Sequence, residues 1–167
     1  MRIYSDSTVV MMELKDSVDA KSLIIIQEVT LANVKDALNF QSKGQVQRFS
    51  SFLQRGDKGY YGYLDKRCVH RSWVVQGPAK VSLHKFYWVN IKENQVFIQY
   101  CETAPEVRGK NIFAHMLSHI GKEYPASRVL TSVDEKNSSS IRSMIKAGFE
   151  EIYRKRIKMI LGIRFIS

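Results

Sequence analysis

The sequence predicts one α/β domain over residues 1–167, with a mixed, mostly antiparallel central sheet and helices on both of its faces. Strand-like and helix-like apolar patterns alternate along the chain, and the last third has the order strand, helix, strand, helix, strand. A chain of 167 residues is long enough to bury one core and short for two. We see no repeat or linker that would divide it.

The N-terminal third predicts two strands and then two helices. Residues 9–12 and 23–26 are short apolar runs bounded by turn residues such as Asp16 and Asp19, which is typical of strands. From residue 31 to residue 53, apolar side chains recur at steps of three and four, with an interruption near residues 42–44. This pattern favours two consecutive helices over one.

The middle of the chain predicts a run of antiparallel strands. Residues 56–59 are rich in glycine and end the second helix, and the segments that follow are rich in aromatic and β-branched side chains. Asp65-Lys66 is the expected turn of a hairpin, which residues 76–78 close. The expected strands are 60–64, 67–75, 86–91 and 95–103.

The C-terminal part predicts alternating helices and strands. A helix over 111–124 carries Ile112, Met116, Leu117 and Ile120 on one face, and Pro125 ends it. Asn137 is a good first residue for the next helix, and Gly148 is a good residue to follow its last turn. The expected elements are therefore helix 111–124, strand 128–133, helix 137–147 and a strand from residue 150 to the end.

Composition and charge exclude several classes of protein. The chain is 44% hydrophobic and 25% charged, which is typical of a folded soluble domain and not of a disordered one. No apolar run approaches the roughly 18 residues of a membrane span, and no signal peptide is visible, so we expect a cytoplasmic protein without a membrane span. The two cysteines, Cys68 and Cys101, cannot form a disulfide framework. His115 and His119 lack a third ligand, so we expect no metal.

The formal net charge of +10 indicates an anionic partner. Residues 54–92 hold eight basic and two acidic side chains, an excess of six, and residues 93–167 hold twelve against eight. The longest basic cluster, residues 154–156, alternates with isoleucines as a solvated strand face does. Because no like-charge block or nucleic-acid-reading motif is present, we expect no nucleic-acid partner.

The segment from residue 96 to residue 113 is the most informative for function. An expected strand ends at Pro105, the basic turn Arg108-Gly109-Lys110 follows, and a helix begins at once. Such a turn directs backbone N–H groups and the positive end of the helix dipole at one spot, where a diphosphate fits. It is not a Walker loop. The alternative is that these residues only begin a helix.

Two motifs resemble the GCN5-related N-acetyltransferases, abbreviated GNAT. Residues 105–113 (PEVRGKNIF) resemble the family's Arg/Gln-x-x-Gly-x-Gly/Ala pyrophosphate motif, with Asn111 and Phe113 where the family usually has small residues. Residues 137–150 (NSSSIRSMIKAGFE) resemble its Asn-x-x-Ala/Ser-x-x-x-Tyr-x-x-x-Gly-Phe element, with Met144 at the tyrosine position. Both motifs occur in the expected order, separated by a helix and a strand.

The resemblance implies the acyl-CoA N-acyltransferase fold and acetyl-CoA as co-substrate. In this family, the strand before the turn splays from its neighbour and pairs with the pantetheine arm, a role that falls to the main chain of Cys101 and Thr103. Asn137 and Ser139 are implied near the pantetheine or the 3′-phosphate end. The pyrophosphate is implied at the backbone N–H groups of Val107, Arg108, Gly109, Lys110, Asn111, Ile112 and Phe113, with Arg108 adding side-chain charge.

The implied reaction is attack of a neutral amine on the acetyl thioester. Glu102, on the splayed strand, is the first candidate for the base, with an exposed structural carboxylate as the alternative. His70 is the second candidate, although we favour a structural role or a substrate contact for it. Met144 cannot donate a proton, so Tyr153 or Tyr100 is a candidate acid, against the alternative, which we favour, that both are core tyrosines.

The two motifs do not specify which amine is the acceptor. Aromatic and basic side chains gather in residues 58–91, which suits sugars or nucleotides, so our hypothesis is a small-molecule primary amine, either an amino sugar or a nucleotide-linked and anionic one. We expect a monomer or a homodimer. The alternative function is a CoA-binding or interaction module that has kept the fold and lost the chemistry, for which Met144 and Phe113 argue.

Overall fold

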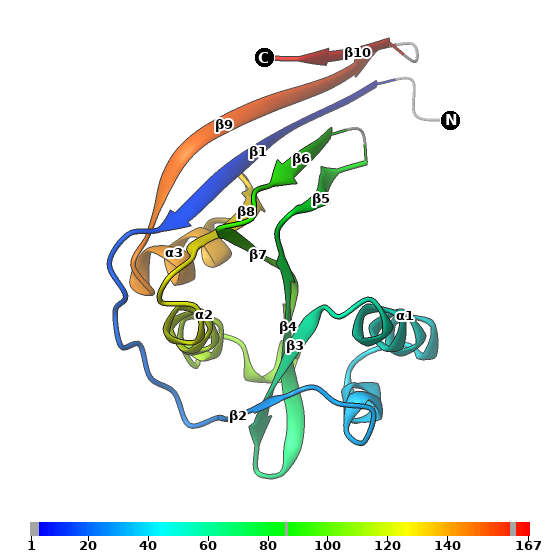
Figure 1. The fold of residues 1–167 in the computed structure, drawn as a ribbon, viewed down its shortest axis with the longest axis vertical. Helices are drawn as coiled ribbons and strands as arrows, with labels where there is room; N and C mark the ends of the chain where they lie inside the picture. The colour runs from blue at the N-terminus through cyan, green and yellow to red at the C-terminus, as the bar shows by residue number, and fades with distance from the viewer. Residues whose placement is uncertain (1–3, 86, 161–162) are drawn as a thin grey trace.

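The computed structural model describes residues 4–85, 87–160 and 163–167 (Figure 1). The strands are β1 (Tyr4–Leu14), β2 (Ile25–Glu28), β3 (Lys58–Leu64), β4 (Arg67–Gln76), β5 (Ala79–His84), β6 (Tyr87–Ile91), β7 (Gln95–Thr103), β8 (Arg128–Asp134), β9 (Phe149–Ile160) and β10 (Ile163–Ile166). The helices are α1 (Lys43–Gln54), α2 (Ile112–Glu123) and α3 (Ser138–Lys146), with short 3-10 helices η1 (Val34–Asn39) and η2 (Pro105–Val107).

One sheet of eight strands organises the described chain, in the order β10-β9-β1-β8-β7-β4-β3-β2, and β5 and β6 form a separate hairpin. Neighbouring strands of the large sheet are antiparallel except for the parallel pair β7 and β8. Figure 1 shows α2 and α3 on one side of the central strands and α1 on the other. The predicted mixed, mostly antiparallel sheet with helices on both faces is confirmed.

The two faces of the sheet bury alternate residues of the strands, as the two-residue period of a strand requires. Val10 and Met12 of β1 pack in the core that α2 and α3 cover, whereas Met11 packs under the β5–β6 hairpin. On the α1 face, Trp73 is fully buried and lies 5.5 Å from Phe49 and 5.1 Å from Phe52 between ring centroids. Burying each such aromatic side chain contributes roughly 1.5–3 kcal/mol.

Of the two helices predicted between residues 31 and 53, the second is the α-helix α1, whereas the first is the short 3-10 helix η1. Ser42 begins α1 with a capping box, because its Oγ accepts from the Gln45 N–H while the Gln45 side chain accepts from the Ser42 N–H. The segment before it is the short 3-10 helix η1, in which Val34 and Ala37 are buried. Leu31 and Leu38 are exposed, since a 3-10 turn does not keep the apolar face of an α-helix.

Other strand limits also differ from the expectation, including those of β1 and β3, which begin earlier than expected. β5 was not predicted, because its alternation of polar and apolar residues is too short to stand out beside the turn at residues 76–78. β2 begins at Ile25 and has β3 as its one strand neighbour in the described ranges, so Leu23 lies outside the strand and is 88% exposed. The C-terminal strand is divided into β9 and β10. Phe86 and residues 161–162, which were expected in strands, lie outside the described residues.

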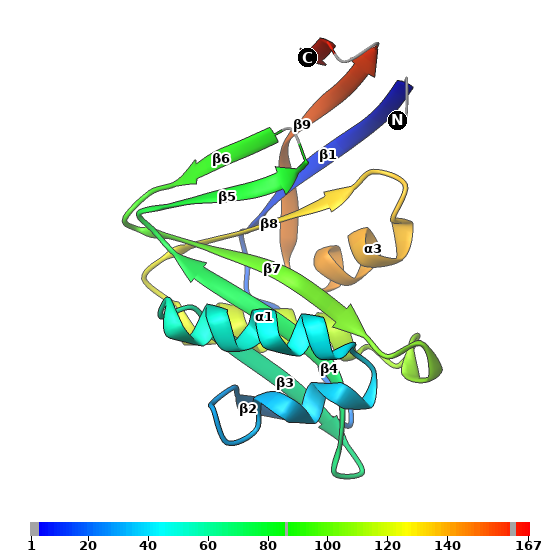
Figure 2. The ribbon, with the colours of Figure 1, turned by 90° about the vertical axis from the view of Figure 1, so that its right-hand side faces the viewer.

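The parallel pair β7 and β8 separates along its length. The ladder joins residues 95–98 of β7 to residues 128–131 of β8 and ends at Ile98 and Thr131, where the Thr131 hydroxyl donates to the Ile98 carbonyl at 3.0 Å. Beyond that point β8 continues with β1, and β7 continues with β4. Figure 2 shows the two strands diverging toward their C-terminal ends. The splayed strand before the basic turn is therefore confirmed.

No helix in the described ranges combines the length and the apolar character needed to cross a membrane.

The carboxylate of Glu13 in β1 forms an ion pair with Arg128 in β8. Its removal tests how much this pair adds to the free energy of unfolding. Glu13 is buried and accepts two hydrogen bonds from Arg128, at 2.7 and 2.9 Å, and one from Lys15 at 2.7 Å. These bonds, with that of Arg128 foremost, lower the pKa of Glu13 to about 2. We expect Glu13→Gln to lower the free energy of unfolding by roughly 1–2 kcal/mol at about pH 7.

The contribution of Glu13 to the free energy of unfolding depends on pH. Because the pKa of Glu13 is lower in the folded protein, its stabilising contribution is complete above the unfolded value of 4.5 and is lost as the pH falls toward about 2. Urea unfolding should therefore show a smaller difference between wild type and Glu13→Gln at about pH 3 than at about pH 7. The exposed Glu93, in the turn between β6 and β7, provides the control Glu93→Gln. A difference that is constant with pH would contradict the assignment.

Candidate functional site

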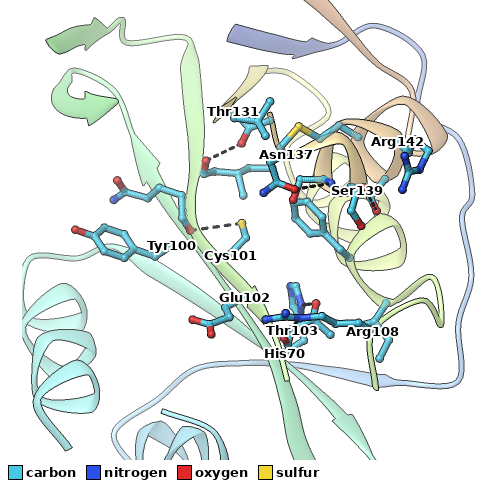
Figure 3. Close-up of a pocket in the computed structure, with 18 of the residues that line it drawn as sticks. His70, Tyr100, Cys101, Glu102, Thr103, Arg108, Thr131, Asn137, Ser139 and Arg142 are labelled. Atoms are coloured by element: carbon cyan, nitrogen blue, oxygen red, sulfur yellow. Dashed lines mark hydrogen bonds between the residues drawn. The ribbon is translucent and has the colours of Figure 1, made fainter. Parts of the chain in front are cut away.

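A cavity of about 800 Å³ lies in the opening between β7 and β8 (Figure 3). Its walls are the diverging parts of these strands, residues 97–103 and 131–134. The turn before α2, the start of α2 and residues of α3 provide most of the remaining lining, to which His70 of β4 and Ser82 of β5 also belong. Every residue predicted to bind the cofactor lines this cavity except Lys110, which is exposed and outside the lining.

A bulge in β7 directs its side chains to opposite sides of the strand. Arg71 pairs with Glu102 and Trp73 with Gln99, so Tyr100 and Cys101 together face Ser72. Tyr100 has a φ of 50° within this bulge. In Figure 3, Tyr100 and Glu102 point to one side of β7 and Cys101 points to the side of Asn137 and Ser139. Side chains of β7 therefore lie on two sides of the strand, with Cys101 on one side and Tyr100 and Glu102 on the other (Figure 3).

The turn before α2 has the backbone of an anion site. Gly109 has a φ of 80°, and Asn111, the residue before α2, has a φ of 61°. The Asn111 side chain does not cap the helix but donates to the carbonyl of Lys21 at 2.9 Å, so within the described part of the chain the first N–H groups of α2 have no side-chain cap. Arg108 donates from Nε to the Thr103 carbonyl at 3.1 Å, which keeps its guanidinium beside the end of β7. Positive charge and free N–H groups therefore converge here.

The start of α3 forms the opposite wall. Asn137 accepts from the Ser140 N–H at 3.1 Å, so it caps the helix as predicted, and Gly148 follows the helix with a φ of 93°. Met144 is buried and lines the cavity at the position where the family motif has tyrosine. Sequence reasoning missed Arg142 and Lys146, which also line it. Their spacing of three and seven residues from Ser139 on a helix was the available signal.

His70 is enclosed between β4 and β7. The His70 side chain is fully buried, with Nδ1 2.7 Å from Thr103 Oγ1 and Nε2 2.9 Å from Ser72 Oγ. Burial lowers the pKa of His70 to about 3, so the ring is neutral at neutral pH. A neutral imidazole between two hydroxyls is a weak base. The structure therefore favours the structural role over the catalytic one for His70.

Glu102 lies on the other side of β7 and carries an ion pair. Its Oε2 accepts from Arg71 Nη2 at 2.7 Å, and its side chain is 36% exposed at the cavity wall. Arg71 is itself buried, donates from Nε to Gln41 Oε1 at 2.8 Å and from Nη1 to the Tyr100 carbonyl, and lies over the Phe49 ring at 5.0 Å. Glu102 is thus a half-exposed carboxylate that Arg71 holds in one direction, and it is among the lining residues of the cavity.

Tyr153 is outside the cavity lining. It lies on β9 and packs against the core under the β5–β6 hairpin, and burial together with a hydrogen bond to Tyr87 raises its pKa to about 12. Of the alternatives for Tyr153, the structure agrees with the core tyrosine. Which side of the sheet a residue of a long strand packs on depends on register, so the sequence left both alternatives for Tyr153 open.

The basic excess of residues 54–92 does not gather at the cavity. No Lys or Arg of that segment lines it, and the basic lining residues Arg108, Arg142 and Lys146 all belong to the turn and α3. Several of its cations instead form ion pairs, among them Arg55 with Asp57, Lys58 with Glu28, Arg67 with Glu106 and Arg71 with Glu102. This distribution gives no support to an anionic acceptor.

Among the residues that the structure describes, no three His, Cys, Asp or Glu side chains are grouped where they could hold a metal ion.

No family model and no curated protein matches the sequence, but solved structures match the fold. A GNAT-family acetyltransferase from Colwellia psychrerythraea matches with a TM-score of 0.69 at 12% identity, over 98% of this chain and 56% of that one. A GCN5-related glucosamine N-acetyltransferase region of a fungal multidomain β-N-acetylglucosaminidase gives 0.62 at 13% identity, over 97% of this chain and 21% of that one.

An aminoglycoside 6′-N-acetyltransferase from Acinetobacter baumannii matches with a TM-score of 0.57 at 13% identity, over 78% of this chain and 92% of that one. The chain thus spans just over half the length of the Colwellia protein. At these identities the similarity establishes the architecture, which agrees with the splayed strands and the turn before α2. The chain therefore has the fold of the GCN5-related N-acetyltransferases.

Proposed function

We propose that residues 1–167 form one acetyl-CoA-dependent N-acetyltransferase domain that acts on the primary amine of a small molecule. The observation that carries this proposal is the end of the β7–β8 ladder at Ile98 and Thr131, which opens a cavity onto the uncapped start of α2. An open strand edge pairs with amide groups, and a helix start binds phosphate. Acetyl-CoA carries both kinds of group one after the other, because the amides of its pantetheine arm are followed by its pyrophosphate.

The residues of the cavity fit this co-substrate along its length. Beyond Ile98, the β8-facing edge of β7 has no strand partner among the described residues, so the main chain near Cys101 and Thr103 is the proposed partner of the pantetheine amides. The N–H groups at the start of α2 would hold the pyrophosphate, with charge from Arg108. Asn137 and Ser139 line the adjoining wall, where Arg142 and Lys146 add positive charge. Acetyl-CoA supplies an acetyl group activated as a thioester.

We propose that Glu102 accepts the proton of the attacking amine. It is the carboxylate among the candidate bases that is exposed to the cavity, and Arg71 fixes its direction. Backbone N–H groups on the free edge of β7 are the proposed donors to the tetrahedral oxyanion. Met144 has no proton to give, so the CoA sulfur leaves as the thiolate, which is a stable enough anion for this step.

An amino sugar is the proposed class of acceptor. Support comes from the aromatic wall that Tyr100 provides next to Glu102, and from the two structural neighbours described as glucosamine and aminoglycoside N-acetyltransferases. The alternative is a CoA-binding module without transferase activity. Met144 in place of tyrosine and the ion pair that occupies Glu102 favour that alternative.

Release of free thiol from acetyl-CoA distinguishes these functions. The protein would be incubated with acetyl-CoA and a panel of amines that includes glucosamine, an aminoglycoside, a polyamine and a lysine peptide, and acetyl-CoA binding would be measured by calorimetry. Turnover with a small amine supports the enzyme. Binding of acetyl-CoA without turnover of any amine would establish the non-catalytic alternative, and absence of both would reject the cavity as a CoA site.

Two glycines provide a matched test of the turn. Gly109 and Gly56 both have positive φ, 80° and 85°, and an added Cβ would meet no atom within 4 Å at either position. We expect Gly109→Ala and Gly56→Ala each to lower the free energy of unfolding by about 1 kcal/mol, because both force alanine into left-handed backbone. Only Gly109→Ala should weaken acetyl-CoA binding, by about tenfold in Kd. Equal affinities of the two variants would contradict a pyrophosphate site at the turn.

A second matched pair tests the proposed base. Glu102→Gln keeps the shape of the side chain and removes its basicity, so we expect kcat to fall by about one hundredfold or more while the Kd for acetyl-CoA stays within about twofold. Glu106→Gln, in η2 and paired with Arg67, is the control, and it should leave kcat unchanged. If Glu102→Gln retained the kcat of the control variant, another group would have to be the base.

A further inference from the structure

Tyr100 has a backbone conformation that tyrosine rarely adopts. Among the described residues, positive φ outside glycine occurs at Asp65, Lys66, Asn111 and Tyr100. Asp65 and Lys66 form a hairpin turn, where this conformation is expected, and Asn111 precedes a helix. Tyr100 instead lies inside β7, with a φ of 50°. For a bulky side chain within a strand this is a true outlier.

The surrounding structure enforces this conformation. The bulge in β7 places Tyr100 and Cys101 opposite the single residue Ser72. The carbonyl of Tyr100 then accepts from Nη1 of Arg71, whose guanidinium is buried and cannot turn away without losing its other partners. Outliers that are held in this way gather at functional sites. Glycine or asparagine would adopt the same backbone at less cost, so the tyrosine side chain itself requires an explanation.

The Tyr100 ring forms a rigid surface beside Glu102. The ring packs on Phe52 in a tilted arrangement, with 5.0 Å between centroids and 55° between planes, and the residue remains 43% exposed at the cavity wall. Figure 3 shows Tyr100 and Glu102 on the same side of β7, away from the proposed cofactor wall. Arg71 donates to Oε2 of Glu102, and no side chain of the described residues donates to Oε1. An aromatic face and an available carboxylate oxygen are therefore adjacent.

We propose that Tyr100 is a specificity-determining residue that stacks on a pyranose ring of the acceptor, while Glu102 receives the amine. The inference rests on the proposed acetyltransferase function and assigns the chemistry by which the acceptor is recognised. The C–H face of a pyranose is apolar and flat enough to pack on an aromatic ring, and an ammonium group pairs with a carboxylate. An acyclic amine satisfies Glu102 but offers no ring to Tyr100.

The experiment measures selectivity between acceptors, because loss of a purely structural role of Tyr100 would lower kcat/KM for every acceptor by the same factor. The ratio of kcat/KM for glucosamine to kcat/KM for ethanolamine would be measured for wild type, Tyr100→Leu and Tyr100→Phe. Tyr100→Leu keeps apolar cover over Phe52 and removes the aromatic face, so the ratio should fall about fivefold to tenfold. Tyr100→Phe keeps the face, so its ratio should equal that of wild type. The KM for acetyl-CoA checks that the cofactor half is intact.

The outcomes separate this inference from the proposed function. An unchanged ratio in Tyr100→Leu, or an equal fall in Tyr100→Phe, would overturn stacking by the ring. Turnover confined to amines without a ring would overturn the inference alone and leave the acetyltransferase function in place. Absence of turnover in the wild type with every amine overturns both. If Tyr100→Leu fails to fold, Tyr100→Asn, which suits the left-handed backbone, replaces it with the same expected fall.

Discussion

The buried guanidinium of Arg71 is the interaction on which the rest of the site depends. Burial lowers the pKa of Arg71, while the Glu102 carboxylate opposes this effect and favours the charged form. A cation away from water is tolerated only when its N–H groups are satisfied, and here they are divided between Gln41, the Tyr100 carbonyl and Glu102. These partners come from the segment before α1 and from β7. One side chain of β4 thus joins the helical layer to the strand that opens the cavity.

The opening of the sheet follows from how β7 is held. Past Ile98, β7 has β4 as its strand neighbour, because β8 follows β1 instead. The bulge at Tyr100 and Cys101 bends β7 at this place, and Arg71 holds the bulge through the Tyr100 carbonyl. On the other side of β7, His70 joins β4 to Thr103. The neutral bond between His70 and Thr103 on one face and the charged bonds of Arg71 on the other therefore hold β7 where β8 no longer pairs with it.

The features predictable from the sequence were those set by neighbours along the chain. The helix cap at Asn137, the positive φ of Gly148 and the turn before α2 depend on a few consecutive residues, and the structure has all three. The pairing of Arg71 with Glu102 across two strands and the burial of His70 depend on register, which local patterns leave open. The same limit explains why Tyr153 was a candidate and why the basic excess of residues 54–92 was associated with the acceptor.

The distribution of charge around β7 changes what the net charge of +10 implies. The cationic lining residues Arg108, Arg142 and Lys146 belong to the turn and α3, on the side where the free N–H groups of α2 lie. On the other side, Arg71 beside the bulge is buried and paired, and Glu102, a lining residue of the cavity, is its partner. An anion is favoured on the first side, and on the second a cation is favoured. The proposed polyanionic co-substrate and the proposed ammonium-bearing acceptor would therefore meet across β7 with complementary charges, and neither would require the basic residues 54–92 that the sequence count emphasised.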